Sequence, residues 1–124
     1  MSRGVVIYID GTVEMKEFNG LKDLQDTVGG LIESIPLTDD TDAYINEEGK
    51  MICQPNIFAT FVAQINKRLN YGDFVAGNMI VVGKPDADGK DTDVPDWVLD
   101  FVTKMNAPEP TIDEVIEELI DEVN

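Results

Sequence analysis

The clearest structural signal in this chain of 124 residues is Val5-Val6-Ile7-Tyr8-Ile9-Asp10-Gly11-Thr12-Val13-Glu14-Met15-Lys16-Glu17-Phe18. Two runs rich in β-branched and aromatic residues flank Asp-Gly. This is the strongest short-range signal for a β-hairpin, because the tight primed turn requires positive φ at both central positions. In the second run, Val13 and Met15 alternate with charged residues, which places one face on a core and the other in water. The stretch therefore predicts an N-terminal hairpin closed by a two-residue turn.

Outward from the hairpin, apolar periodicity and turn residues predict the other elements. The glycines at 29 and 30 are expected to end a short helix that opens at Asn19-Gly20. Asn56 is a good N-cap for a helix that runs to Leu69. Residues 78–82 are nearly all apolar, which is typical of a central strand. The further expected elements are strands over 31–37 and 43–46, a turn over 47–50, a helix beginning near Pro95, and a last helix whose capping box is Thr111 and Glu114.

Together these elements predict an α+β fold in a single domain over residues 1–106. In it, the hairpin belongs to a small mixed or antiparallel sheet packed by about four helices, a size that suits the length of the chain. Residues 107–124 form an acidic amphipathic C-terminal helix in this prediction. We expect that helix to dock on the domain or to mediate association.

The charge of the chain is strongly and unevenly negative. Twenty-five carboxylates face nine Lys and Arg, a net charge of −16. Residues 1–82 carry 12 acids and 6 bases, whereas residues 83–124 carry 13 acids and 3 bases. Such a chain repels nucleic acid and anionic membranes and attracts basic protein surfaces. We therefore expect a protein partner with a basic surface, no direct nucleic-acid binding and no membrane association.

Residue types that are missing from the chain narrow its chemistry. Without histidine, and with Cys53 as its one cysteine, the chain cannot form a Ser-His-Asp or Cys-His unit or a Cys/His zinc site. A lone cysteine fits a reducing compartment, and neither a signal-peptide layout nor an apolar run of about 18 residues occurs. The sequence predicts a cytoplasmic, non-enzymatic protein with no cofactor, no catalytic residue and no metal site.

Several short strings along the chain resemble one family. They are Val28-Gly29-Gly30-Leu31-Ile32-Glu33 leading to Ile35-Pro36-Leu37, Asn46-Glu47-Glu48-Gly49, Pro55-Asn56 with Ala59-Thr60, and Gly77-Asn78 before Ile80-Val81-Val82-Gly83. In order and spacing they resemble an uncharacterised family of small domains from bacteriophages and mobile elements, described only as a domain of unknown function. The resemblance covers roughly residues 5–103. It implies a phage or mobile-element accessory protein in a bacterial cytoplasm, and it implies no reaction.

The acidic C-terminal region is the first candidate for a binding surface. Its carboxylates are Glu109, Asp113, Glu114, Glu117, Glu118, Asp121 and Glu122, with no base after Lys104. Along a helix, six acids in 14 residues average one per about 3.5 Å, close to the roughly 3.4 Å phosphate spacing of a DNA strand. Mimicry of DNA is one interpretation, and the ordinary polar side of an amphipathic helix is the plainer one. The apolar seam formed by Ile112, Ile116, Leu119 and Val123 offers a third, a homodimer through this helix.

Two other groups of polar residues invite functional interpretations. Glu33, Asn46, Asn56 and Asn78 define an alternative cleft for a small ligand such as a nucleotide signal, while Glu33 has no positioned partner for acid–base catalysis. Asp86, Asp88, Gly89, Asp91 and Asp93 do not follow the EF-hand order, which favours a solvated acidic turn over a calcium site.

The function expected from these observations is that of a binding protein. It is a non-enzymatic accessory protein that binds a host protein through its acidic surface, with counter-defence or DNA mimicry as its role. The alternatives are a small-ligand binding or sequestering protein and a homo-oligomeric structural or interaction protein.

Overall fold

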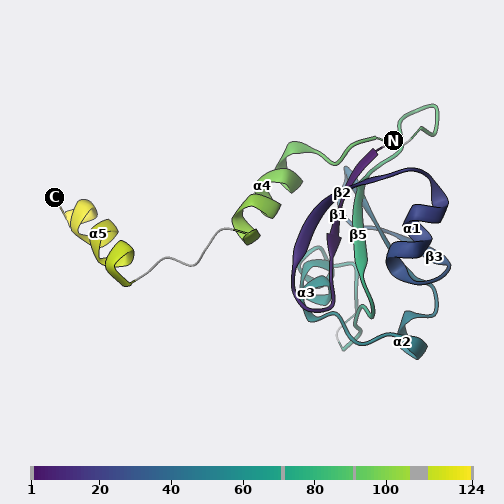
Figure 1. The fold of residues 1–124 in the computed structure, drawn as a ribbon, viewed down its shortest axis with the longest axis horizontal. Helices are drawn as coiled ribbons and strands as arrows, with labels where there is room; N and C mark the ends of the chain where they lie inside the picture. Colours follow the sequence, from purple (N-terminus) through teal and green to yellow (C-terminus); the bar gives the residue numbers. More distant parts are fainter. Residues whose placement is uncertain (1, 71, 91, 107–111, 124) are drawn as a thin grey trace.

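The fold is an α+β domain built on one antiparallel sheet (Figure 1). The computed structural model describes residues 2–70, 72–90, 92–106 and 112–123, with the backbone alone at 105, 106, 122 and 123. The strands are β1 (Ser2–Ile7), β2 (Val13–Phe18), β3 (Ile32–Pro36), β4 (Thr41–Asn46) and β5 (Met79–Gly83), and their order in the sheet is β2-β1-β5-β4-β3. The helices are α1 (Leu21–Val28), α2 (Gly49–Ile52), α3 (Ile57–Ile65), α4 (Asp96–Asn106) and α5 (Ile112–Val123).

The two faces of the sheet are both covered. Successive residues of a strand point to opposite faces, so Val5 and Val81 pack under α3 and α4, whereas Val6 and Ile80 pack under α1. Figure 1 shows α1 and α4 on opposite sides of the sheet. This double burial explains why β5 is apolar throughout, and the prediction that it is a central strand is confirmed.

The hairpin of β1 and β2 is confirmed, but its turn differs from the predicted one. The backbone N–H of Gly11 donates to the carbonyl oxygen of Tyr8 at 3.0 Å, and the N–H of Tyr8 donates to that of Thr12 at 2.9 Å. Gly11 has φ 89°, whereas Asp10 is not in the positive-φ region. The prediction of a primed turn is therefore wrong. The strands are joined by a longer loop in which glycine alone has the left-handed conformation, as in hairpins with a bulge.

Helix α3 begins as predicted and ends earlier. Asn56 caps it, since its side-chain oxygen accepts from the N–H of Ala59 at 2.9 Å. The helix ends at Ile65 instead of Leu69, because Lys67 takes a left-handed φ of 57° and the N–H of Arg68 returns to the carbonyl oxygen of Ala63 at 2.9 Å. This is a left-handed C-cap that uses lysine where glycine is usual.

The segment 47–50, predicted as a turn, contains the start of the one-turn helix α2. Gly49 allows the helix to approach the neighbouring backbone, because a Cβ there would lie 2.6 Å from the carbonyl oxygen of Ala76. The predicted cap residue of the last helix, Thr111, lies outside the described residues. In the part of the chain that the structure describes, no helix is both long and apolar enough to cross a membrane.

Candidate functional site

Helix α5 exposes both of its sides. With about 100° between successive residues of a helix, the apolar residues of α5 fall within an arc of about 140° and the acids on the opposite side. The five apolar residues of α5 whose side chains are described are exposed, from 40% at Val115 to 79% at Ile112. Figure 1 shows α5 lying apart from the sheet, beyond α4. The helix is therefore amphipathic, with an apolar side that its own domain does not cover.

The acidic side of α5 carries most of the residues predicted for partner binding. Its exposed acids are Asp113, Glu114, Glu117, Glu118 and Asp121. Glu122 lies in α5 and is described by its backbone alone, and Glu109 lies outside the described residues. Because the helix of 12 residues is about 18 Å long, its five described acids form a dense negative surface. The structure places these five predicted residues on one helix, and binding by them stays a prediction.

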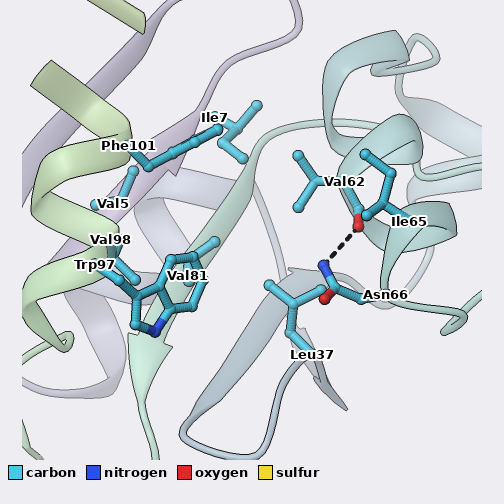
Figure 2. Close-up of a pocket in the computed structure, with 10 residues that line it drawn as sticks. All are labelled: Val5, Ile7, Leu37, Val62, Ile65, Asn66, Val81, Trp97, Val98 and Phe101. Atoms are coloured by element: carbon cyan, nitrogen blue, oxygen red, sulfur yellow. Dashed lines mark hydrogen bonds between the residues drawn. The ribbon is translucent and has the colours of Figure 1, made fainter. Parts of the chain in front are cut away.

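A second surface, which sequence reasoning missed, lies between α3 and α4. A cavity of about 260 Å³ opens there above the sheet, and its polar lining is limited to Asn66 and the indole N–H of Trp97. Figure 2 shows side chains of α4 on one wall, side chains of α3 and Asn66 on the other, and β1 and β5 beneath them. Its lining is Val5, Ile7, Leu37, Val62, Ile65, Asn66, Val81, Trp97, Val98 and Phe101. We call this feature the α3/α4 groove.

The outer side of α3 extends the apolar surface of the groove. Ile57, Phe61 and Ile65 follow one another at intervals of four residues, and they are 83%, 58% and 61% exposed. Their helical spacing is also typical of residues that face a core. The structure turns Ala59 and Ala63 to the core instead, and both are fully buried. We call Ile57, Phe61 and Ile65 the α3 stripe.

Polar and aromatic contacts fix the walls of the α3/α4 groove. The rings of Phe58 and Phe101 lie 5.9 Å apart between centroids and join α3 to α4. The indole N–H of Trp97 donates to the carboxylate of Asp40, with distances of 3.2 and 3.3 Å to its two oxygens. The side-chain amide of Asn66 donates to the carbonyl oxygen of Val62 at 2.8 Å. These contacts fix the positions of α4 and of the end of α3 on the two sides of the groove.

Two cations follow the last turn of α3, close in sequence to the groove residues Ile65 and Asn66. Lys67 and Arg68 are both exposed, and the Nε of Arg68 donates to the carbonyl oxygen of Leu37, another groove residue, at 3.1 Å. Neither cation forms an ion pair with any carboxylate among the described residues. One end of the groove therefore offers positive charge in a chain that is otherwise acidic.

The amide of Asn56, predicted as part of a ligand cleft, is used within the fold. The residue is fully buried, and its side-chain NH₂ donates to the carbonyl oxygens of Ile7 and Gly77, each at 2.9 Å. Its oxygen caps α3. An Asn side chain has two donor hydrogens, and Asn56 uses both in hydrogen bonds to backbone carbonyl oxygens.

The other predicted cleft residues are divided between two cavities. Glu33 and Asn46 line one of about 280 Å³, and Asn78 lines another of about 350 Å³. The amides of Asn46 and Asn78 donate to the carbonyl oxygens of Val28 and Thr27, at 3.0 and 3.1 Å, and so hold the end of α1. The structure does not bring the four residues to one cleft.

The acidic loop after β5 has an internal structure of its own. One carboxylate oxygen of Asp86 accepts from the backbone N–H groups of Asp88 and Lys90, each at 2.9 Å. Asp93 accepts from the backbone and guanidinium of Arg3, which lowers the pKa of its carboxyl group. Asp91 lies outside the described residues. Among the residues that are described, no group of three or more potential metal ligands comes together.

Two of the other perturbed titratable groups lie in the hairpin. The hydroxyl of Tyr8 donates to the carboxylate of Glu14 at 2.6 Å, and this hydrogen bond, with burial and the nearby negative charge, raises the pKa of Tyr8 to about 12. Asp10 accepts from the hydroxyl and the backbone N–H of Thr12, which lowers the pKa of its carboxyl group. Both groups have local partners that account for the shifts.

The architecture defines a small α+β domain with an antiparallel five-stranded sheet, followed by a separate acidic helix. The chain belongs to the family described as a domain of unknown function, DUF3846, whose model matches residues 1–107. Helix α5 lies beyond the matched residues. In the same comparisons, neither a curated protein nor a solved structure matched this chain.

Proposed function

We propose that this chain is a non-enzymatic accessory protein of a bacteriophage or mobile element. In this proposal it acts in the bacterial cytoplasm by binding a host protein with a basic surface through the acidic side of α5. The exposure of a whole row of carboxylates on one side of this helix carries the proposal. The role that fits this surface is interference with a host defence. The acids would occupy the partner surface that otherwise binds DNA phosphates.

The electrostatics of α5 support a protein partner. Acids at i and i+4 repel one another by a few tenths of a kcal/mol per pair, so the acidic side does not stabilise the helix itself. No Lys or Arg follows Lys104 to offset these charges. A dense field of one sign speeds the encounter with a partner of the opposite sign and disfavours nucleic acid.

The perturbed carboxyl groups support a binding role better than an enzymatic one. Catalytic carboxylates work as pairs in unlike environments that push their pKa values apart. Asp10, Asp73 and Asp93 all have lowered pKa values, each caused by a hydrogen bond or cation that also fastens a loop or strand end. For Asp73 that partner is Lys50.

The small-ligand alternative has weaker support. The amides of Asn46, Asn56 and Asn78 were expected to read a polar ligand. Instead, they bond to the backbone near the ends of α1, α3 and β1. A ligand would have to compete with these bonds, and releasing a buried backbone carbonyl costs about 1–3 kcal/mol.

The test is capture of a binding partner from bacterial lysate by two charge variants of the full chain. One variant reverses acids of α5, with Glu117→Lys, Glu118→Lys, Asp121→Lys and Glu122→Lys. The matched control reverses four acids outside α5, with Asp39→Lys, Glu47→Lys, Asp88→Lys and Asp100→Lys, and so has the same net charge. We expect the first variant to lose the partner and the control to keep it. Equal capture by both variants would reject the proposal.

Salt dependence provides a second measurement of the same proposal. Screening shortens the range of the field to about 10 Å at 0.1 M salt and about 3 Å at 1 M. A complex held by acids on a basic surface should therefore weaken steeply as salt rises. A complex that is unchanged at high salt would point to a different contact.

A further inference from the structure

The apolar side of α5 is exposed, and the proposed function assigns no partner to it. An isolated helix shorter than about 12–15 residues is marginal in water, and most helices owe their stability to packing of an apolar side. Helix α5 has 12 residues, repelling acids and five exposed large apolar residues. Helix α5 should therefore form fully only when its apolar side is covered.

The same chain carries a surface of matching chemistry and length. The α3 stripe is apolar and exposed, and the α3/α4 groove beside it opens onto a buried apolar floor. Helices α4 and α3 are 11 and 9 residues long. At 1.5 Å per residue, α4 is about 16 Å and α5 about 18 Å long. A third helix laid along this groove would place rows of residues spaced at i, i+4 against the α3 stripe, as helices pack by ridges into grooves.

Charge complementarity also points to α5 as the occupant of the groove. Lys67 and Arg68 follow the end of α3 and have no carboxylate partner among the described residues. Helix α5 has acids and no base. When its apolar residues face the groove, Asp113 lies about 20° outside the apolar arc, where such an acid can reach cations on a rim.

We propose that α5 of one copy docks in the α3/α4 groove of a second copy, and that the exchange is reciprocal. The placement of α5 favours the second copy over the helix's own groove. Figure 1 shows α5 lying apart from α3, β1 and β5, the elements that line the groove together with α4.

Reciprocal docking covers the apolar side of α5 and the α3/α4 groove in both copies. The same patches meet on both subunits, as in the two-fold dimers that are commonest among oligomers. Because each copy contributes one helix and one groove, the interface contains two equivalent helix–groove contacts. The acidic side of α5 faces outward in this arrangement, so the dimer presents two acidic rows.

The test uses cysteine pairs in purified protein, with Cys53→Ser as the background. One chain carries Ile65→Cys in the groove and another carries Leu119→Cys on α5, and the two are mixed under mild oxidation. Both residues are more than half exposed, so neither change removes a core contact. We expect a disulfide-linked pair of unlike chains. The matched control carries Glu118→Cys, on the acidic side of α5, and should link at least about tenfold less.

Three results would overturn the inference. The first is an internally linked monomer from the chain that carries both Ile65→Cys and Leu119→Cys, because it places α5 on its own groove. The second is linking no greater than in the Glu118→Cys control. In parallel, sedimentation equilibrium of the wild-type chain should show a dimer whose dissociation constant rises about tenfold or more with Leu119→Asp. A monomer at all concentrations would contradict the proposal equally.

The proposed dimer contact lies on the side of α5 opposite to the proposed partner surface. The dimer and the binding of a host protein can therefore be tested separately. Dimerisation is measured on the purified chain without any host protein. Two chains of net charge −16 repel each other, and salt screens that repulsion. The dimer should therefore persist or strengthen with rising salt, whereas the complex with a basic partner should weaken.

Discussion

The side-chain amide of Asn56 donates to the backbone carbonyl oxygen of Ile7 at 2.9 Å, which ties the start of α3 to the end of β1. A second bond from the same amide reaches Gly77, just before β5. One buried side chain thus connects the two neighbouring strands at the centre of the sheet to the helix that forms a wall of the α3/α4 groove.

Replacing Asn56 should destabilise the domain strongly. Asn56→Ala leaves two buried carbonyl oxygens and the first turn of α3 without their partner, so we expect a loss of about 2–4 kcal/mol in the free energy of unfolding. Urea unfolding measures it. The control is Asn66→Ala, whose side chain makes a single, partly buried bond, with an expected loss of about 1 kcal/mol or less. Equal losses would contradict the assigned role of Asn56.

The hydrogen bond between Tyr8 and Glu14 predicts a pH dependence at the alkaline end. Since the folded pKa of Tyr8 is about 12 and its ordinary value is 10.0, the contribution to stability is complete below pH 10. It is lost as the pH rises through about 12. Absorbance titration of tyrosinate should show one late step that disappears in Tyr8→Phe. In Glu14→Gln the same step should move towards pH 10, and an unchanged step would contradict the assignment.

The bond between Arg3 and Asp93 predicts a dependence at the acidic end. It joins β1 to the segment before α4, where the N–H of Val94 also donates to the carbonyl oxygen of Arg3 at 3.2 Å. The pKa of Asp93 is lowered in the folded chain, so its contribution is present above the ordinary pKa and is lost as the pH falls through the lower folded value. Asp93→Asn should remove that part of the acid dependence in urea unfolding between about pH 5 and 2. Asp88→Asn, which does not contact Arg3, is the control.

Removal of α5 should leave the domain intact. Its apolar side chains are exposed, so a shortened chain that ends at Asn106 should unfold with a free energy within about 0.5 kcal/mol of the full chain, at protein concentrations where the full chain is monomeric. Urea unfolding of the two chains makes the comparison. A loss of several times that size would show that α5 packs on its own domain.

The parts of the fold that the sequence predicts are those with local signals. Asp10-Gly11 marks the hairpin, Gly29 ends α1 in the left-handed conformation, and Asn56 caps α3. Each works within a few residues, so no knowledge of the tertiary structure is needed. The turn type was mispredicted because Asp-Gly also suits a longer loop in which glycine alone has positive φ.

The α3/α4 groove could not be predicted because it depends on how α3 is rotated against the sheet. Helical spacing is the same for the stripe of Ile57, Phe61 and Ile65 as for a core side, and only the structure shows that Ala59 and Ala63 are buried instead. The structural roles of Asn46, Asn56 and Asn78 could not be predicted either. The backbone carbonyl oxygens that accept from their side-chain amides lie 18 to 51 residues away along the chain. The acids of α5, which recur in adjacent pairs along one helix, were accessible to sequence reasoning.

If α5 acts by contacting another protein chain, amide hydrogen exchange over residues 112–123 will report that contact. A helix of this length and charge exchanges rapidly when it is uncovered. We expect its amides to become protected as the concentration of the purified chain rises, and to lose that protection when Ile65→Asp alters the groove. Rapid exchange at every concentration, in the purified chain and in the chain captured with partners alike, would contradict the claim.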